Sequence, residues 1–326
     1  MRIPNKLQAG DEVRVVAPST SMSINQEENA RHSIERLEEM GLRVTLGQHV
    51  NESDEFTSSS IQSRVKDLHD AFQDPNVKAI LTFLGGYNVN QILRYLDYDL
   101  IHNNPKILCG YSDITALGTA IYTQSDLVTY SGPHFSTFGM KKGLEYTEDL
   151  FKKCLFAEEP YELYPADYWS DDPWFRDQEN RTFNEQGPFD VLQEGEAEGT
   201  IIGGNLCTLN LLQGTEYMPS LKDKILFIED DYLTQDLTFD RDLQSLLHLP
   251  DADKIKALVI GRFQPQSDIS DETLRLIIER KAELKGIPVI SNVNFGHTQP
   301  TSIFPIGGKA RILANGQESK IEILEH

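Results

Sequence analysis

The sequence has few of the features that mark metal-binding, redox or secreted proteins. Its 326 residues include only 3 cysteines. Cys109, Cys154 and Cys207 are scattered, without the paired spacing of a zinc or redox motif. We therefore expect three reduced, buried, structural thiols. No apolar run approaches the ~20 residues of a membrane span, and the N-terminus has no signal-peptide core. These absences predict a cytoplasmic protein without a membrane partner.

Basic residues are scarce relative to acidic ones. Lys and Arg total 30 against 51 Asp and Glu, for a formal net charge of -21. Such a chain repels nucleic acid and anionic membranes, so we expect neither as a partner. The sequence also lacks a P-loop and a dinucleotide-binding glycine fingerprint. We therefore expect no nucleotide cofactor, and nothing in the sequence implies a metal or another cofactor.

The first half of the chain alternates strand-like and helix-like segments. EVRVVAPS (12–19) and VKAILTFLGG (77–86) are apolar and β-rich, whereas INQEENARHSIERLEEMG (24–41) has helical periodicity. This alternation predicts an α/β fold with a mostly parallel sheet covered by helices on both faces. The second half restarts at EGTIIGGN (198–205), and ARILANGQESKIEI (310–323) predicts a hairpin with an Asn-Gly turn.

The pattern breaks between residues 156 and 197, where the chain is acidic, aromatic and irregular. Both tryptophans, Trp169 and Trp174, lie there. We predict two domains: a Rossmann-like N-terminal domain (1–160) and a smaller α/β C-terminal domain (196–326). Residues 161–195 are expected to form a connecting loop that faces the substrate.

A serine stands at the end of an apolar strand in KILCGYSDITAL (106–117). A strand–turn–helix with Ser112 at the turn follows the logic of a nucleophile elbow. The spacing differs from G-x-S-x-G, because Thr115 and Ala116 stand where a glycine would follow. On local pattern alone, the alternative is that Ser112 or Asp113 caps the next helix.

Three further stretches end at the same predicted edge of the sheets. The Gly-Gly pair in FLGGYNVNQIL (83–93) is either a tight turn or a source of an oxyanion donor at Gly86 or its neighbour. Glu229 ends the strand KILFIE and is able to orient a histidine, although acids at strand ends are commonly solvated. His297 follows an apolar strand and a glycine. His134 is a secondary candidate.

The stretches CGYSDITAL, LGGYNVNQIL, ILFIEDD, IGGNL and NFGHTQP together resemble the LD-carboxypeptidase family of serine peptidases, over nearly the whole chain. The resemblance implies a triad assembled across two domains. Ser112 would be the nucleophile, His297 the general base and Glu229 the residue that orients it. The backbone N–H groups of Gly86 and Asp113 would form the oxyanion hole. The resemblance also implies a homodimer.

The family has two branches, and both remain open at this point. One removes the terminal D-Ala from murein tetrapeptides in wall recycling. The other, the microcin C immunity peptidases, cleaves peptidyl- or aminoacyl-nucleotide conjugates, and the loop sequences here resemble it more. Trp169 or Trp174 would then stack on a nucleobase, or else anchor the loop. Arg262 would bind a substrate carboxylate, or else form a surface ion pair. A non-catalytic small-ligand binding protein is the alternative of another class.

Overall fold

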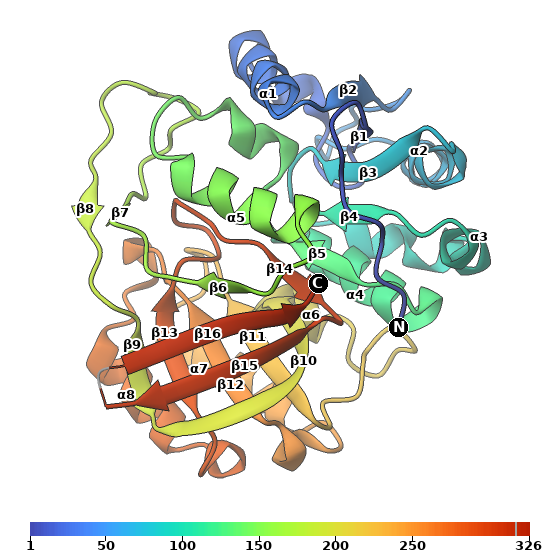
Figure 1. Ribbon diagram of the computed structural model, residues 1–326. Coiled ribbons are helices and arrows are strands. Elements are labelled where there is room, and N and C mark those ends of the chain that lie inside the picture. Colours follow the sequence, from blue (N-terminus) through green and yellow to red (C-terminus); the bar gives the residue numbers. More distant parts are fainter. Residues whose placement is uncertain (317) are drawn as a thin grey trace.

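The computed structural model describes residues 1–316 and 318–326, which form an α/β fold built on two main sheets (Figure 1). The predicted fold class is therefore confirmed. The first sheet has the strand order β14-β5-β4-β3-β1-β2, and β1 to β5 are parallel, as the continuous apolar strands predicted. Its strands are β1 (Glu12–Val16), β2 (Arg43–Leu46), β3 (Val77–Thr82), β4 (Ile107–Cys109), β5 (Thr129–Ser131) and β14 (Phe304–Ile306).

The second sheet has the order β6-β16-β15-β10-β11-β12-β13-β9. Its central strands β10 to β13 are parallel, and antiparallel strands flank them on both sides. The strands are β6 (Tyr161–Leu163), β9 (Asp190–Gln193), β10 (Gly195–Asn205), β11 (Lys224–Glu229), β12 (Ala257–Gly261), β13 (Val289–Val293), β15 (Lys309–Asn315) and β16 (Glu318–Glu325). A separate two-stranded ribbon pairs β7 (Tyr168–Trp169) with β8 (Asn184–Glu185).

The helices begin and end where the local sequence provides caps. The Ser60 hydroxyl accepts a hydrogen bond from Ser63 N–H at the start of α2, and Ser270 does the same for Thr273 at α8. The α-helices are α1 (Glu27–Glu39), α2 (Ile61–Gln73), α3 (Tyr98–Asn103), α4 (Ile114–Ser125), α5 (Glu145–Phe156), α6 (Leu206–Asn210), α7 (Asp236–Leu247) and α8 (Asp271–Glu279). The 3-10 helices are η1 (Met22–Ile24), η2 (Val89–Tyr95), η3 (Phe135–Gly139), η4 (Ala252–Lys254), η5 (Pro265–Ser267) and η6 (Ala282–Leu284).

The segment predicted as a connecting loop, 161–195, contains four short strands. Of these, β6 and β9 lie at the two edges of the second sheet. The C-terminal half also reaches back, because β14 pairs antiparallel with β5 at the edge of the first sheet (Figure 1). The predicted hairpin is present as β15 and β16, although part of its turn, residue 317, lies outside the described residues.

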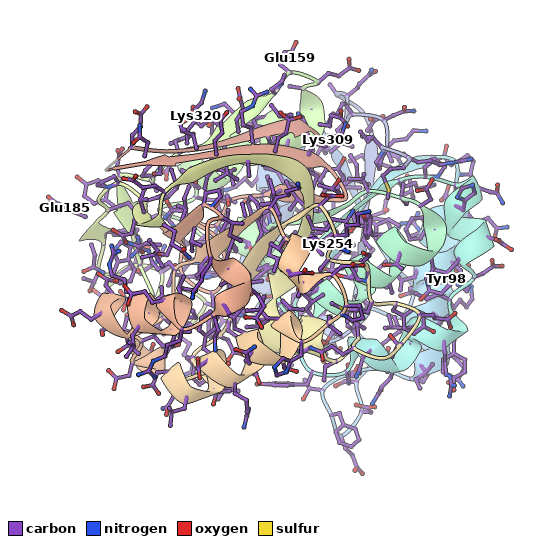
Figure 2. All side chains as sticks on the ribbon, turned by 90° about the horizontal axis from the view of Figure 1, so that it is seen from below. Tyr98, Glu159, Glu185, Lys254, Lys309 and Lys320 are labelled. Atoms are coloured by element: carbon purple, nitrogen blue, oxygen red, sulfur yellow. The ribbon has the colours of Figure 1, made fainter. Side chains whose placement is uncertain are left out.

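Charged side chains cover the outside of the molecule. Lys254, Lys309 and Lys320 project from its surface in Figure 2, and each lies within ion-pair distance of a carboxylate. Of the three thiols, Cys109 and Cys154 are buried as expected, but Cys207 is exposed. The expectation of a buried thiol was wrong for Cys207: this residue lies in the first turn of the short helix α6 and is exposed, although its thiol donates to the buried Asn205 side chain. No helix among the described residues is long and apolar enough to cross a membrane.

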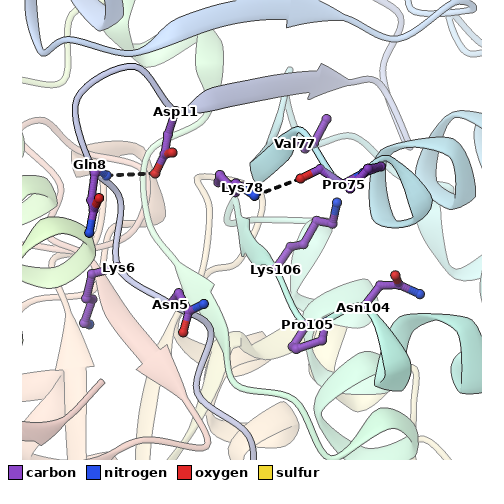
Figure 3. A pocket seen from close by; sticks show the side chains of 10 residues that line it. All are labelled: Asn5, Lys6, Gln8, Asp11, Pro75, Val77, Lys78, Asn104, Pro105 and Lys106. Carbon is purple, nitrogen blue, oxygen red and sulfur yellow. Dashed lines mark hydrogen bonds between the residues drawn. The ribbon is translucent and has the colours of Figure 1, made fainter.

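A cavity of about 320 Å³ lies at the amino-terminal edge of the first sheet (Figure 3). Its lining comes from the segments 5–11 and 104–106, which precede β1 and β4, and from 75–78, which includes the first two residues of β3. Ligands of α/β sheets bind at the opposite edge, beyond the carboxyl ends of the strands. The candidate residues Ser112, Glu229 and His297 all follow or end strands, so they belong to that opposite edge.

Candidate active site

Ser112 lies in the sharp turn between β4 and α4, with a left-handed backbone of φ 60°. A positive φ is unusual for a residue with a side chain and occurs at turns that present functional groups. Gly85, in the loop between β3 and η2, lies directly against this turn. A Cβ on Gly85 would stand 2.9 Å from the Ser112 Cβ and 3.0 Å from its Oγ. The glycine therefore allows the two loops to approach each other.

The structure brings Ser112, His297 and Glu229 together. The His297 Nε2 atom lies 3.0 Å from the Ser112 Oγ, and its Nδ1 atom lies 2.7 Å from the Glu229 Oε2. Glu229 is 3% exposed. Ser112 comes from the first sheet and Glu229 from the second, while the His297 loop leads into β14 of the first sheet. Because β14 pairs with β5, the His297 loop is attached to the same sheet that carries Ser112.

Close packing holds Glu229 in place. A Cβ on Gly296, which has φ 108°, would stand 2.7 Å from the Glu229 Oε2. A Cβ on Gly261 would stand 2.8 Å from the Glu229 Cβ. Larger residues at either position would displace the carboxylate, because real Cβ atoms do not approach so closely.

The Asp113 side chain does not cap α4, which excludes that alternative for this residue. Its Oδ2 atom instead accepts hydrogen bonds from the backbone N–H groups of Asn88 (3.0 Å) and Val89 (2.9 Å) and from the Ser19 hydroxyl (2.5 Å). The carboxylate therefore fastens the start of η2 to the serine turn. In the described part of the chain, the N–H groups of Gly86 and Asp113 donate to no other protein group.

A second buried carboxyl group lies beside Glu229. Asp230 is 0% exposed, and its Oδ1 atom accepts hydrogen bonds from the Asn205 side chain (3.1 Å) and from Asp231 N–H (3.2 Å). The same Asn205 amide lies 3.3 Å from the Glu229 Oε1. Burial, followed by the charge of Glu229, raises the pKa of Asp230 to about 7.

The carboxylates around His297 set its basicity. Burial alone would lower the pKa of His297, but the charge and hydrogen bond of Glu229 oppose this effect, and Asp231 and Asp230 add to that opposition when they are ionised. The net result is a pKa raised above the ordinary value of 6.5. The imidazolium form is therefore stabilised at the point where a base would accept a proton.

The secondary candidate, His134, does not join this group. It is 1% exposed, and its Nδ1 atom lies 2.9 Å from the Thr82 hydroxyl. Its ring stacks on Tyr111 with centroids 4.3 Å apart, and the Tyr111 ring also lies 5.4 Å from that of His297. Burial lowers the pKa of His134 to about 3, so the ring is neutral and supports the wall of the site.

Trp169 and Arg262 form a stacked pair, with the guanidinium carbon 4.7 Å from the indole centroid. The Arg262 Nη2 atom donates to the Gln186 Oε1, and no carboxylate among the described residues forms an ion pair with this guanidinium. Both side chains line a cavity of about 380 Å³ that also touches Gly261. Trp174 lies elsewhere, partly buried against the core and next to Phe175.

Sequence reasoning missed Asn205 and Asp230. Their only local signal is position, since each stands at or just after the end of a parallel strand in the second sheet. No cluster of three His, Cys, Asp or Glu side chains suited to a metal ion occurs within 1–316 and 318–326.

Comparison with known families decides the class of protein. Residues 13–132 match the LD-carboxypeptidase N-terminal domain, and residues 198–312 match the LD-carboxypeptidase C-terminal domain. The chain belongs to the LD-carboxypeptidase family. The resemblance inferred from the motifs is therefore confirmed, and the protein is a serine peptidase, a hydrolase. The family relationship also argues against a non-catalytic binding protein.

Several relatives in the LD-carboxypeptidase family align with this chain over almost its whole length. A Bacillus subtilis protein named "Putative carboxypeptidase YocD" is 59% identical over 99% of both chains. The microcin C7 self-immunity protein MccF of Escherichia coli is 31% identical over 94% of this chain and 91% of its own. The crystal structure of an MccF-like protein from Bacillus anthracis has a TM-score of 0.99 at 56% identity, with 100% of both chains covered.

Solved structures of MccF itself include ligand complexes. The complex with aspartyl sulfamoyl adenosine matches this chain with a TM-score of 0.89 at 29% identity, covering 100% of this chain and 99% of the other. Another MccF structure is a mutant with tryptophan replaced by phenylalanine, in complex with adenosine monophosphate.

Proposed function

We propose that Ser112, His297 and Glu229 form the catalytic triad of this hydrolase. The carrying observation is the continuous chain of contacts from the Ser112 Oγ through both ring nitrogens of His297 to the Glu229 Oε2. His297 Nε2 removes the hydroxyl proton as the Ser112 Oγ attacks the substrate carbonyl carbon. Glu229 accepts the Nδ1 hydrogen bond and stabilises the imidazolium. The proton then passes to the leaving group, and water hydrolyses the acyl-enzyme.

The oxyanion is proposed to bind to the N–H groups of Asp113 and Gly86. Asp113 N–H follows the nucleophile at the start of α4, where helix N–H groups are free. The Gly85 carbonyl accepts a hydrogen bond from Thr20 N–H. Because a trans peptide directs its N–H opposite to its C=O, Gly86 N–H points away from Thr20. The contact of Gly85 with the Ser112 side chain supports this placement.

The proposed substrate class is an aminoacyl- or peptidyl-nucleotide conjugate, cleaved at the bond between the acyl group and the nucleotide. The cavity that holds Trp169 and Arg262 supports this class, because an indole and a guanidinium plane are both able to stack on a nucleobase. The ligands in the MccF structures support it by similarity. Of the two tryptophans, Trp169 is the proposed stacking residue, because it lines the cavity.

A paired hydrolysis assay on the purified protein tests the substrate class. One substrate is an aminoacyl sulfamoyl adenosine, and the other is a murein tetrapeptide that ends in D-Ala. We expect cleavage of the conjugate and little of the tetrapeptide. Exclusive cleavage of the tetrapeptide would contradict the proposal and place the protein in wall recycling, as the Pseudomonas aeruginosa relative named murein tetrapeptide carboxypeptidase suggests.

Replacement of Trp169 by Ala is expected to raise KM for the nucleotide conjugate about 5- to 150-fold, since base stacking contributes about 1–3 kcal/mol per base. Trp169→Phe retains an aromatic face and is expected to lose much less. Steady-state kinetics with the three proteins measures the effect. Equal KM values for wild type and Trp169→Ala would remove Trp169 from the nucleobase site.

The pH dependence of kcat/KM should report the pKa of His297. A general base must be neutral to accept a proton, and the pKa of His297 is raised above 6.5. Activity is therefore expected to rise with pH through an apparent pKa above that value and to be lost at lower pH. A pH-rate profile in which the rate already reaches its plateau below pH 6.5 would contradict this assignment.

A further inference from the structure

The buried neighbours Glu229 and Asp230 are two acidic groups with only one cationic partner, the His297 ring, and the triad does not explain the second acid. Both carboxyl groups are buried, at 3% and 0% exposure. Glu229 has one cationic partner, the His297 ring. Among the described residues, Asp230 has no Lys, Arg or His partner, and its Oδ2 atom is buried without any hydrogen-bond partner. An unpaired buried charge is strongly unfavourable, and such groups are protonated instead.

Asn205 links the two carboxyl groups, and its orientation is fixed. Its Oδ1 atom accepts from the Thr208 N–H (3.1 Å), the Thr208 hydroxyl (2.8 Å) and the Cys207 thiol (3.0 Å). The amide NH2 group must therefore face the carboxyl groups, with the Glu229 Oε1 at 3.3 Å and the Asp230 Oδ1 at 3.1 Å. One amide group thus holds one oxygen of each acid.

Two carboxylates held this closely in a buried site do not both ionise readily. Glu229 keeps the negative charge, because His297 Nδ1 donates to it. The Asp230 Oδ1 atom already accepts two N–H groups, which leaves Oδ2 as the atom able to carry a proton. A neutral O–H without a partner is a smaller penalty there than an unpaired charge.

We infer that Asp230 is a positioning residue that holds a proton in the resting enzyme, so that the Glu229–Asn205–Asp230 cluster carries a single negative charge. This inference rests on the proposed triad. The groups that face Asp230 are Glu229, Asp231 and Cys207, with His297 beyond Glu229. With one charge in the cluster, the His297 imidazolium is stabilised, yet it is still able to release its Nε2 proton to the leaving group. A second charge would hold that proton more tightly.

The substitution Asp230→Asn tests this directly, because an amide reproduces a protonated carboxyl group with one acceptor and one donor atom. The matched control is Asp231→Asn, which removes a carboxylate from the adjacent, partly exposed position. The first measurement is the infrared spectrum of each protein at pH 6. We expect the wild type to show a protonated-carboxyl band that disappears in Asp230→Asn and persists in Asp231→Asn. If Asp230→Asn leaves the band unchanged, Asp230 is ionised and the inference is wrong.

Stability against pH gives a second readout that does not depend on turnover. The folded-state pKa of Asp230 is raised from 3.8 to about 7, so the folded protein binds a proton that the unfolded chain releases. Wild-type stability from this group is therefore present below pH 3.8 and is lost as pH rises towards about 7. Asp230→Asn lacks this loss. Its Tm relative to wild type is expected to increase between pH 4 and pH 7, and a constant or decreasing difference would contradict the inference.

Turnover then tests which charge state of the cluster the reaction requires. We expect Asp230→Asn to keep kcat/KM at pH 6 within about threefold of wild type, because it preserves the charge state of the cluster. A loss of about 100-fold in a folded protein would show that an ionised Asp230 is required, and would overturn the inference. If Ser112→Ala stays active, the triad itself fails. In that case the infrared and stability measurements still decide whether Asp230 carries the proton.

Discussion

Replacement of Ser112 by Ala is expected to lower kcat on the order of 10⁴-fold or more, with little change in Tm. The change removes one hydroxyl group, whose Oγ atom lies 3.0 Å from the His297 Nε2. Alanine carries a Cβ as serine does, so the left-handed backbone at φ 60° is about as strained in the variant as in the wild type. Residual activity would come from the oxyanion hole and from substrate binding alone.

The measurement is steady-state and single-turnover hydrolysis of the conjugate, with a thermal melt of the same sample. Ser131→Ala is a suitable control, because Ser131 ends the neighbouring strand β5 and forms no hydrogen bond with the three triad residues in the described structure. It is expected to retain near-normal turnover. Ser112→Ala protein with turnover close to wild type would show that another group is the nucleophile.

The α/β class and the position of the site at the carboxyl ends of strands were predictable from local pattern. Each of Ser112, Glu229 and His297 ends or follows an apolar strand, and the sequence places all three at edges where α/β sites form. The family motifs selected these three from other polar strand ends. The contacts in the structure place them within hydrogen-bonding distance, while their chemical roles stay a proposal.

Long-range contacts were not predictable in the same way. The Asp113 carboxylate accepts a hydrogen bond from the N–H of Asn88, which precedes η2 and lies 25 positions away in the sequence. Nothing local to Asp113 indicates that partner. The pairing of β14 with β5 is equally hidden, because a three-residue apolar strand carries no signal of which sheet it joins. Such contacts depend on how two sheets meet, and periodicity describes only one element at a time.

The segment 161–195 shows a related difficulty. Its acidic and aromatic composition suggested a loop, yet β6 and β9 pair with β16 and β13 at the edges of the second sheet. Short edge strands have little periodicity of their own, since their order comes from a partner strand. The predicted domain bounds within this segment stay a prediction.

Replacement of Glu229 by Gln is the second variant with a large expected effect. Gln has the same length, and its Oε1 atom is still able to accept the Asn205 hydrogen bond. Its amide, however, would donate to His297 Nδ1 where the carboxylate accepted. The ring would then carry its hydrogen on Nε2, facing Ser112, in a tautomer that cannot remove the hydroxyl proton. A loss in kcat on the order of 10⁴-fold is expected, as for the equivalent change in other serine hydrolase triads.

Kinetics of Glu229→Gln, of Ser112→Ala and of the double variant measure this effect. Because the residues act as a unit, the double variant is expected to be little worse than Ser112→Ala. Glu198→Gln, at an exposed position on β10 that pairs with Arg311, is the control for loss of a carboxylate. Multiplicative losses would mean that Glu229 acts independently of Ser112. The inference about Asp230 adds one expectation. Asp230 stays buried without a cationic partner when Glu229 is replaced, so its protonated-carboxyl infrared band should persist in Glu229→Gln at pH 6. Loss of the band would show that the charge of Glu229, and not burial, keeps the proton on Asp230.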